Sequence, residues 1–150
     1  MNTLLDTNLL ARTVQLSHPM HRLAADALAE LRRQGDVLCL VPQNLYEFWA
    51  VCTRPAAQNG LGMSLAQTQT EFARIKTVFT LLDDTPDIFP QWEHLVIQYQ
   101  IQGKNAHDAR LVAAMMVHGL NRILTFNVGD FQRYQTLTVL DPQQVVAPPP

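Results

Sequence analysis

The sequence has few charged residues, few cysteines and no long apolar run. Charged residues make up 16% of its 150 residues and hydrophobic ones 47%, a balance that excludes a disordered chain. The net charge of −2 and the pI near 6.2 give the chain no general attraction for nucleic acid or for an anionic membrane surface. Any binding of nucleic acid must therefore rely on local positive charge or on a bound metal ion.

The two cysteines, Cys39 and Cys52, stand in apolar surroundings. This predicts buried free thiols in a reducing compartment rather than a disulfide or a zinc site. No apolar run approaches the length needed to span a membrane. Asp6 interrupts the N-terminus and no basic segment precedes it, which argues against a secretory signal. We therefore expect a cytoplasmic protein with no membrane partner.

The length predicts a single domain over residues 1–146, with a disordered Pro-rich tail at 147–150. Short apolar runs predict buried strands at Thr3–Leu5, Val37–Val41, Arg122–Thr125 and Leu137–Leu140, with a short edge strand at Thr80–Leu82. Amphipathic stretches predict helices at 19–34, 42–52, 65–79, 88–100 and 106–118, and Ser64 with Gln67 forms a capping box. This alternation favours an α/β fold, with a central, mostly parallel sheet flanked by helices.

An acid, Asp6, follows the first apolar run where the predicted strand ends and a helix begins. Taken alone, Asp6 or the nearby Asn8 is best interpreted as a helix cap, because both residue types are favoured there. Glu47, early in the helix after the second strand, is by itself a solvated surface residue. Its distance from the strand, however, is little more than one helical turn, which places it at the same sheet edge as Asp6.

Asp108 is the strongest single anomaly in the sequence. Leu111, Val112 and Met115 follow it at i+3, i+4 and i+7, so its side chain points along the buried face of a helix. A favourable dipole interaction at a helix N-terminus contributes only about 0.3–1 kcal/mol. An unpaired inward carboxylate costs several times that amount. A local structural role therefore does not explain this residue.

Asp130 follows the strand Arg122–Thr125, together with Asn127. An Asx turn would account for Asn127 and Asp130 without any further role. In a parallel sheet, however, functional sites form beyond the carboxyl ends of the strands, and this edge also receives Asp6, Glu47 and Asp108. We therefore expect four acids to converge there, with Thr125 and Asn127 beside them.

Crowded carboxylates raise one another's pKa unless a cation neutralises them. Oxygen ligands without histidine or cysteine select Mg²⁺, or Mn²⁺ as its substitute, over zinc. Two such ions about 3.5–4 Å apart would clamp an in-line displacement at a phosphodiester. The acids thus predict a metal-dependent phosphodiester hydrolase.

The sequence resembles the PIN-domain ribonucleases of the VapC-like toxin type, found in type II toxin–antitoxin pairs. The ordered set of motifs that carries the resemblance is Leu5-Asp6-Thr7-Asn8, Glu47, His107-Asp108-Ala109-Arg110-Leu111, Leu124-Thr125-Phe126-Asn127 and Asp130-Phe131. The resemblance implies a PIN-like three-layer α/β fold and endonucleolytic cleavage of RNA with Mg²⁺ or Mn²⁺. It implies catalytic roles for Asp6, Glu47, Asp108 and Asp130, metal ligation by Asp6, Asp108 and Asp130, and supporting roles for Asn8, Thr125 and Asn127. It also implies an antitoxin protein as partner, and a homodimer.

Several basic residues could contact substrate phosphates, although each is more often a solvated surface charge. These residues are Arg12, Arg54, Lys104, Arg110 and Arg133. We prefer Arg12 and Lys104, which flank the predicted edge. Two other functions stay open. One is an inactive PIN-like domain that binds RNA or protein, against which the intact set of acids argues. The other is a phosphatase-like or receiver-like domain, whose acids would cluster after the first strand.

Overall fold

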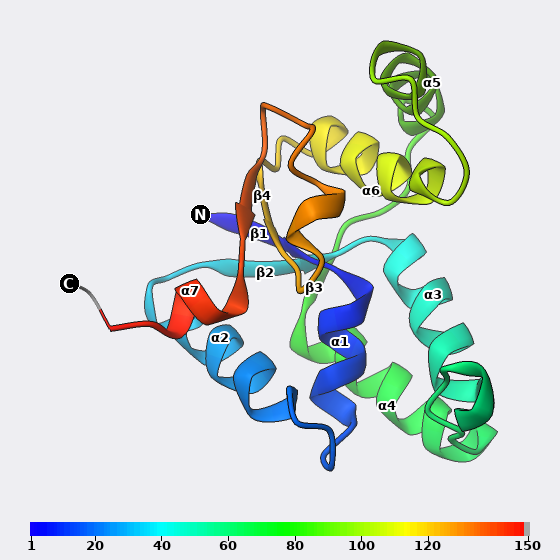
Figure 1. Cartoon of the computed structure of the whole chain (residues 1–150), viewed down its shortest axis with the longest axis vertical. Coiled ribbons are helices and arrows are strands. Elements are labelled where there is room, and N and C mark those ends of the chain that lie inside the picture. Colours follow the sequence, from blue (N-terminus) through cyan, green and yellow to red (C-terminus); the bar gives the residue numbers. More distant parts are fainter. Residues whose placement is uncertain (149–150) are drawn as a thin grey trace.

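The computed structural model describes residues 1–148, and its centre is a sheet of five parallel strands (Figure 1). The strands are β1 (Asn2–Leu5), β2 (Val37–Leu40), β3 (Thr80–Leu81), β4 (Arg122–Leu124) and β5 (Thr138–Leu140). Their order across the sheet is β3-β2-β1-β4-β5, so β1 lies in the middle. In this register Leu4 stands opposite Cys39 on one side and Ile123 on the other. The predicted α/β fold is confirmed, including the edge strand at Thr80.

Seven α-helices lie within the described residues: α1 (Thr7–Val14), α2 (His21–Arg33), α3 (Pro42–Thr53), α4 (Leu65–Val78), α5 (Ile88–Gln98), α6 (Asn105–Val117) and α7 (Pro142–Val146). Two short 3-10 helices, η1 (Ala56–Gln58) and η2 (Val128–Asp130), follow α3 and β4. The capping box is confirmed, because Ser64 Oγ accepts the Gln67 N–H at 3.1 Å and Gln67 Oε1 accepts the Ser64 N–H at 3.0 Å. The sequence pattern did not predict α7, where the Gln143 N–H donates to the capping Asp141 carboxylate at 2.9 Å.

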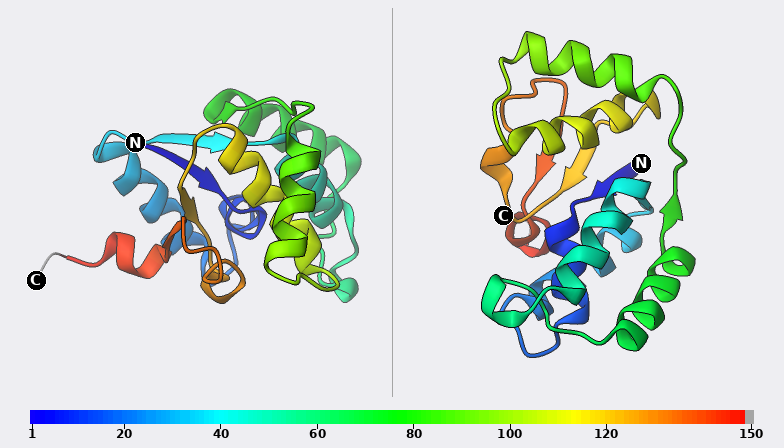
Figure 2. Two further views of the ribbon diagram at one scale, coloured as in Figure 1. Left: turned by 90° about the horizontal axis from the view of Figure 1, so that it is seen from above. Right: turned by 90° about the vertical axis from the view of Figure 1, so that its right-hand side faces the viewer.

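Helices cover both faces of the sheet (Figure 2). Successive strand residues point to opposite sides of the sheet, so each face packs against its own set of helices. Leu4 and Ile123 pack in one apolar core with α5 and α6. Leu5 and Leu124, one residue further along each strand, pack in a second core with α1, α2, α3 and α4. Burial on both faces explains why these strands are continuous apolar runs.

The predicted buried thiols are confirmed: Cys39 belongs to the first core, Cys52 to the second, and neither forms a disulfide. Among residues 1–148, none of the helices combines the length and apolar character that crossing a bilayer requires. Of the predicted tail, Ala147 and Pro148 are exposed and belong to no helix or strand, whereas residues 149 and 150 lie outside the described residues.

Candidate active site

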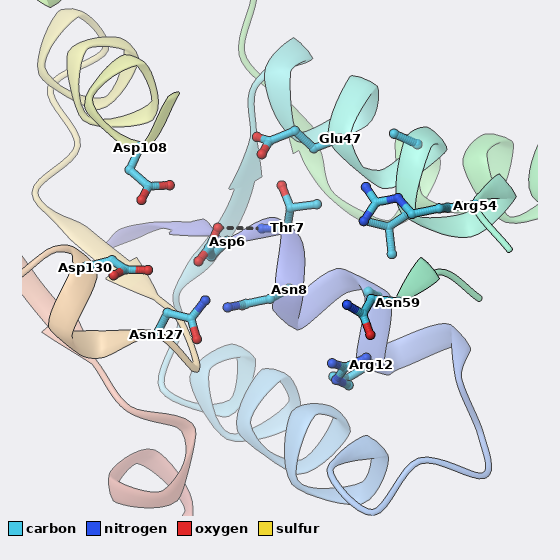
Figure 3. Close-up of a pocket in the computed structure, with 13 residues that line it drawn as sticks. Asp6, Thr7, Asn8, Arg12, Glu47, Arg54, Asn59, Asp108, Asn127 and Asp130 are labelled. Carbon is cyan, nitrogen blue, oxygen red and sulfur yellow. Dashed lines mark hydrogen bonds between the residues drawn. The ribbon is translucent and has the colours of Figure 1, made fainter. Parts of the chain in front are cut away.

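A cavity of about 360 Å³ opens at the carboxyl edge of the sheet, between α1 and α3 (Figure 3). All four predicted acids line it, and they come from the junction of β1 with α1, from α3, from α6 and from η2. They are Asp6, Glu47, Asp108 and Asp130. The other lining residues are Thr7, Asn8, Ala11, Arg12, Ala50, Val51, Arg54, Asn59 and Asn127. The convergence expected from the order of strands and helices is therefore present.

Asp6 caps α1 and lines the cavity at the same time, so both interpretations of this residue apply. Its side chain is buried, and Oδ1 accepts the backbone N–H of Thr7 at 2.8 Å. Oδ2 accepts a hydrogen bond of 2.7 Å from the hydroxyl of the fully buried Thr125. Burial raises the pKa of Asp6, and these two hydrogen bonds oppose the rise. The carboxylate is therefore held in one orientation at the strand end.

Asn44 fixes the start of α3 against the end of β1. Its Oδ1 accepts the Val41 N–H at 2.9 Å, and its Nδ2 donates to the Leu5 carbonyl at 3.0 Å. Three residues further on, Glu47 is half-buried and faces the cavity, unlike a solvated surface residue. Burial raises the pKa of Glu47, a hydrogen bond from Gln43 opposes this rise, and the negative charge of Asp6 adds to it.

Gln43 links α3 to the first turn of α6 and was not predicted from the sequence. This residue is buried, and its Nε2 donates to the His107 carbonyl at 2.8 Å. Its Oε1 accepts a hydrogen bond of 3.2 Å from Arg110. Because His107 directly precedes Asp108, the bridge sets how far the acid of α6 lies from the acid of α3.

Asp108 shows the electrostatic cost of the convergence, because all three other acids raise its pKa. Burial raises the pKa of Asp108 to about 6, and the charges of Asp6, Asp130 and Glu47 add to the rise. Such mutual effects require the four carboxylates to lie near one another. The inward orientation that the helical spacing predicted is thus consistent with its position in the cavity wall (Figure 3).

Thr125 connects Asp6 to the segment that carries Asp130. Its hydroxyl donates to Asp6 and accepts the backbone N–H of Asn127 at 2.9 Å. The Asn127 carbonyl in turn accepts the Asp130 N–H at 3.0 Å, which starts η2. The turn is therefore closed by the threonine hydroxyl and the backbone, and the Asn127 side chain lines the cavity instead.

Within residues 1–148 none of the four acids forms an ion pair. The buried Asp36 shows the contrast, because it lies 3.2 Å from Arg122 and 3.6 Å from the amino group of Met1. A buried carboxylate without such a partner is costly unless a cation or a proton neutralises it. The four acids therefore concentrate negative charge at one end of the cavity, and within the described residues no basic side chain is paired with any of them there.

The donor atoms of the cavity fit a hard divalent cation. Glu47 Oε1 and both amide atoms of Asn8 are shielded from solvent and have no hydrogen-bond partner within the described residues. Carboxylate and amide oxygens are the ligands that Mg²⁺ and Mn²⁺ prefer. In the part of the chain that the structure describes, no three acidic, histidine or cysteine side chains already form a group that could hold an ion. Ion binding would therefore draw the carboxylates closer together.

The end of the cavity away from the acids is polar and basic (Figure 3). Arg12, one of the two preferred phosphate-binding candidates, lies there. Lys104 is exposed just before α6 and does not line the cavity, so its role stays a prediction. Arg54, the less favoured candidate, lines the cavity together with Asn59.

Helical spacing could have identified Arg54 from the sequence. Glu47, Ala50 and Val51 line the cavity from α3 at positions i, i+3 and i+4, and Arg54, the C-cap residue directly after the helix, follows at i+7 and lines it too. Arg54 therefore extends, one residue past the end of α3, the helix face that carries the acid. No comparable local pattern points to Asn59, which reaches the cavity through the loop after α3.

These observations define a class of α/β domain: a parallel sheet whose carboxyl edge carries four unpaired acids from separate segments. The PIN domain family model matches residues 3–137, and the chain belongs to this family. The family resemblance inferred from the acidic motifs is thereby confirmed.

One sequence relative agrees with this membership, and two solved structures share the fold. The chain is 30% identical over 143 residues to Ribonuclease VapC24 of Mycobacterium tuberculosis (strain CDC 1551 / Oshkosh), covering 92% of this chain and 94% of that protein. Its fold resembles VapBC-1 from nontypeable Haemophilus influenzae, with a TM-score of 0.70, 17% identity and coverage of 95% and 99% of the two chains. It also resembles VapC20 of Mycobacterium tuberculosis, described as a sarcin-ricin loop cleaving toxin, with a TM-score of 0.59, 18% identity and coverage of 81% and 86%.

Proposed function

We propose that this protein is a Mg²⁺- or Mn²⁺-dependent endoribonuclease that cleaves RNA phosphodiesters, acting as the toxin of a toxin–antitoxin pair. The observation that carries the proposal is the set of four acids around one cavity, without an ion pair among residues 1–148 and with an oxygen-only donor set. Its similarity to a protein named as a ribonuclease supports RNA as the substrate.

Asp6, Asp108 and Asp130 are suited to hold the ion, and Glu47 to hold a ligand water or a second ion. When bound, the metal supplies positive charge that offsets the acids and makes a water molecule more acidic. Thr125 and Thr7 keep the Asp6 carboxylate in place, so its geometry needs little adjustment. Asp6 and Asp108 orient the attacking water with their oxygens, while Asn8 and Asn127 offer amide groups to the substrate.

The substrate that best suits this cavity is single-stranded or loop RNA. A cavity of about 360 Å³ is at the small end of ligand sites and has room for roughly one nucleotide. An A-form duplex hides its bases in a deep groove, whereas loops can present a single splayed nucleotide. The likeness to solved VapBC and toxin–antitoxin complexes supports an antitoxin protein as partner. The family resemblance supports a small antitoxin that covers the cavity, and a homodimer.

Cleavage of a labelled structured RNA by wild type and by Asp6→Asn tests the proposal. Wild type should cleave with Mn²⁺ or Mg²⁺ and stop in excess chelator, whereas Asp6→Asn should be inactive in both. Sequencing of RNA 5′ ends after expression in a bacterial host extends the test to cellular RNA. Equal cleavage by the two proteins would refute the site. Metal binding without cleavage of any RNA would favour an inactive binding domain.

A further inference from the structure

The cavity has two chemically different ends, and the acids account for only one of them (Figure 3). Arg54 and Asn59 form the other end together with Arg12. Within residues 1–148 Arg54 makes no ion pair and no side-chain hydrogen bond, and the Arg12 guanidinium bonds only to the neutral Gln15, at 2.8 Å. Two positive charges are thus available to an anion at this end.

The backbone around Arg54 is held firmly by the loop that follows α3. Leu61 N–H donates to the Val51 carbonyl at 2.9 Å, and Gly62 N–H donates to the Arg54 carbonyl at 2.9 Å. At Gly60 an added Cβ would lie only 2.0 Å from the Arg54 carbonyl oxygen, so a side chain there would force the backbone to move. The loop therefore depends on a close approach that only glycine permits. Such a loop fixes the backbone of Arg54, and the exposed Arg54 side chain extends from this fixed point.

The two ends are separated by a distance suited to one nucleotide. Arg54, the C-cap residue of α3, follows Glu47 by seven residues, which corresponds to about 10 Å between their backbone positions along the helix axis. The small side chains of Ala11 and Ala50 line the cavity between them and leave the space open. One nucleotide of an extended strand, together with the reach of an arginine side chain, spans this distance.

In the middle of the cavity, the side-chain amide of Asn8 has no hydrogen-bond partner within the described residues. Asn8 lies between the acidic and the basic end, and both its amide atoms are buried without a hydrogen bond in the described part of the chain (Figure 3). Buried polar atoms are normally paired, so this amide is placed to meet polar atoms of a bound molecule. The ligand of the cavity should therefore be polar in its middle as well as anionic at its basic end.

We propose that Arg54, assisted by Arg12 and Asn59, binds the RNA phosphate next to the scissile one. The inference rests on the proposed ribonuclease function and adds residues that hold the substrate. Arginine suits this task because its planar guanidinium donates two parallel hydrogen bonds to a phosphate. The scissile phosphate then lies at the acidic end, and the nucleotide between the two phosphates passes Asn8.

Binding of a short, fluorescent single-stranded RNA of mixed sequence tests the inference. The measurement uses fluorescence anisotropy at several salt concentrations, in the Asp6→Asn background so that the RNA stays intact. Arg54→Ala should weaken binding about tenfold and reduce the slope of log affinity against log salt by about 0.7. Arg54→Lys should keep the slope because it keeps the charge. Asn59→Gly preserves the left-handed backbone at φ 63° and should weaken binding about threefold.

Arg22→Ala provides the matched control, because it removes the same charge from an exposed position of α2 outside the cavity. It should change neither affinity nor slope. With Asp6 intact, Arg54→Ala should raise KM and leave kcat and the calorimetric affinity for Mn²⁺ unchanged.

The outcomes separate the two proposals. If wild type cleaves RNA but Arg54→Ala binds RNA as tightly as Arg22→Ala does, the proposed phosphate site is wrong. The proposed ribonuclease function is then retained. If Arg54→Ala also lowers Mn²⁺ affinity or the melting temperature, its role is structural and the inference fails. If wild type neither binds nor cleaves RNA, both proposals fail.

Discussion

At the scale of single residues, Asp108 serves activity and lowers the stability of the metal-free fold. Its pKa of about 6 reflects burial and three neighbouring carboxylates. We predict that Asp108→Asn abolishes cleavage. In chelator near neutral pH, the same change should raise the free energy of unfolding by about 1 kcal/mol, because it removes a carboxylate that its neighbours repel and that solvent partly screens. Urea titration of both proteins measures this. A loss of about 3–5 kcal/mol instead would indicate a buried structural ion pair.

Thr125 holds the Asp6 carboxylate and the turn before Asp130 in place. Its hydroxyl serves two partners, the Asp6 carboxylate and the Asn127 N–H. Thr125→Val retains the shape but leaves both groups without this bond, which should lower the free energy of unfolding by about 1–3 kcal/mol. Cleavage should also slow, because the Asp6 carboxylate loses its fixed orientation. Thr13→Val is a useful control, because that hydroxyl bonds only to a carbonyl within α1. Equal effects of the two changes would remove the special role of Thr125.

At the scale of elements, the loop after α3 determines the shape of the basic end of the cavity. Gly60→Ala should destabilise the protein by about 2 kcal/mol, because the new methyl group collides with the Arg54 carbonyl. It should also weaken RNA binding, because Arg54 would move. Gly129→Ala is the matched control for stability, since an added Cβ there meets no atom within 4 Å. Thermal melting compares the two variants, and an unchanged melting temperature for Gly60→Ala would show that the loop adapts freely.

At the scale of the whole molecule, the acids link stability to pH and to metal. The folded chain has raised pKa values at Asp6, Glu47 and Asp108. Because the pKa of Asp108 rises from 3.8 to about 6, the folded chain binds more protons at this residue than the unfolded chain does between about pH 3.8 and about pH 6. The favourable contribution of these carboxyl groups to the free energy of unfolding is complete below the pKa that they have in the unfolded chain. It is lost as the pH rises through the pKa that they have in the folded chain. In chelator, wild type should therefore gain stability relative to Asp108→Asn when pH falls from about 7 to about 5.

Mn²⁺ should remove much of this pH dependence by neutralising the carboxylates. Because it binds the folded state, it should also raise the melting temperature of wild type in proportion to the logarithm of its concentration. Differential scanning calorimetry at several Mn²⁺ concentrations measures both effects. An equal rise for Asp6→Asn plus Asp108→Asn would place the ion elsewhere.

Much of this molecule follows from local sequence. Apolar runs such as that ending in Leu5 are buried on both faces of a parallel sheet, and that burial requires apolar residues at successive positions. Asp6 directly follows such a run and Asp130 follows the run of β4, so both lie at the carboxyl edge, because parallel strands end on the same side. Glu47 and Asp108 lie near the first turns of α3 and α6, which begin at that edge. The fold and the convergence of Asp6, Glu47, Asp108 and Asp130 were therefore predictable. Their roles as catalytic residues and metal ligands stay predictions.

Only the tertiary structure decided what lies opposite the acids. Arg54 and Asn59 reach the cavity because α1 packs against α3 and because the loop after α3 folds back on its own helix. Lys104 is near Asp108 in sequence yet lies outside the cavity, since it precedes the first turn of α6. The secondary structure of a segment depends mainly on residues close to it in sequence, so the periodicity of apolar residues predicts it. The spacing from Glu47 to Arg54 is a local signal. The elements that meet to close the far wall, however, depend on helix packing and loop closure between distant residues, which no local pattern encodes.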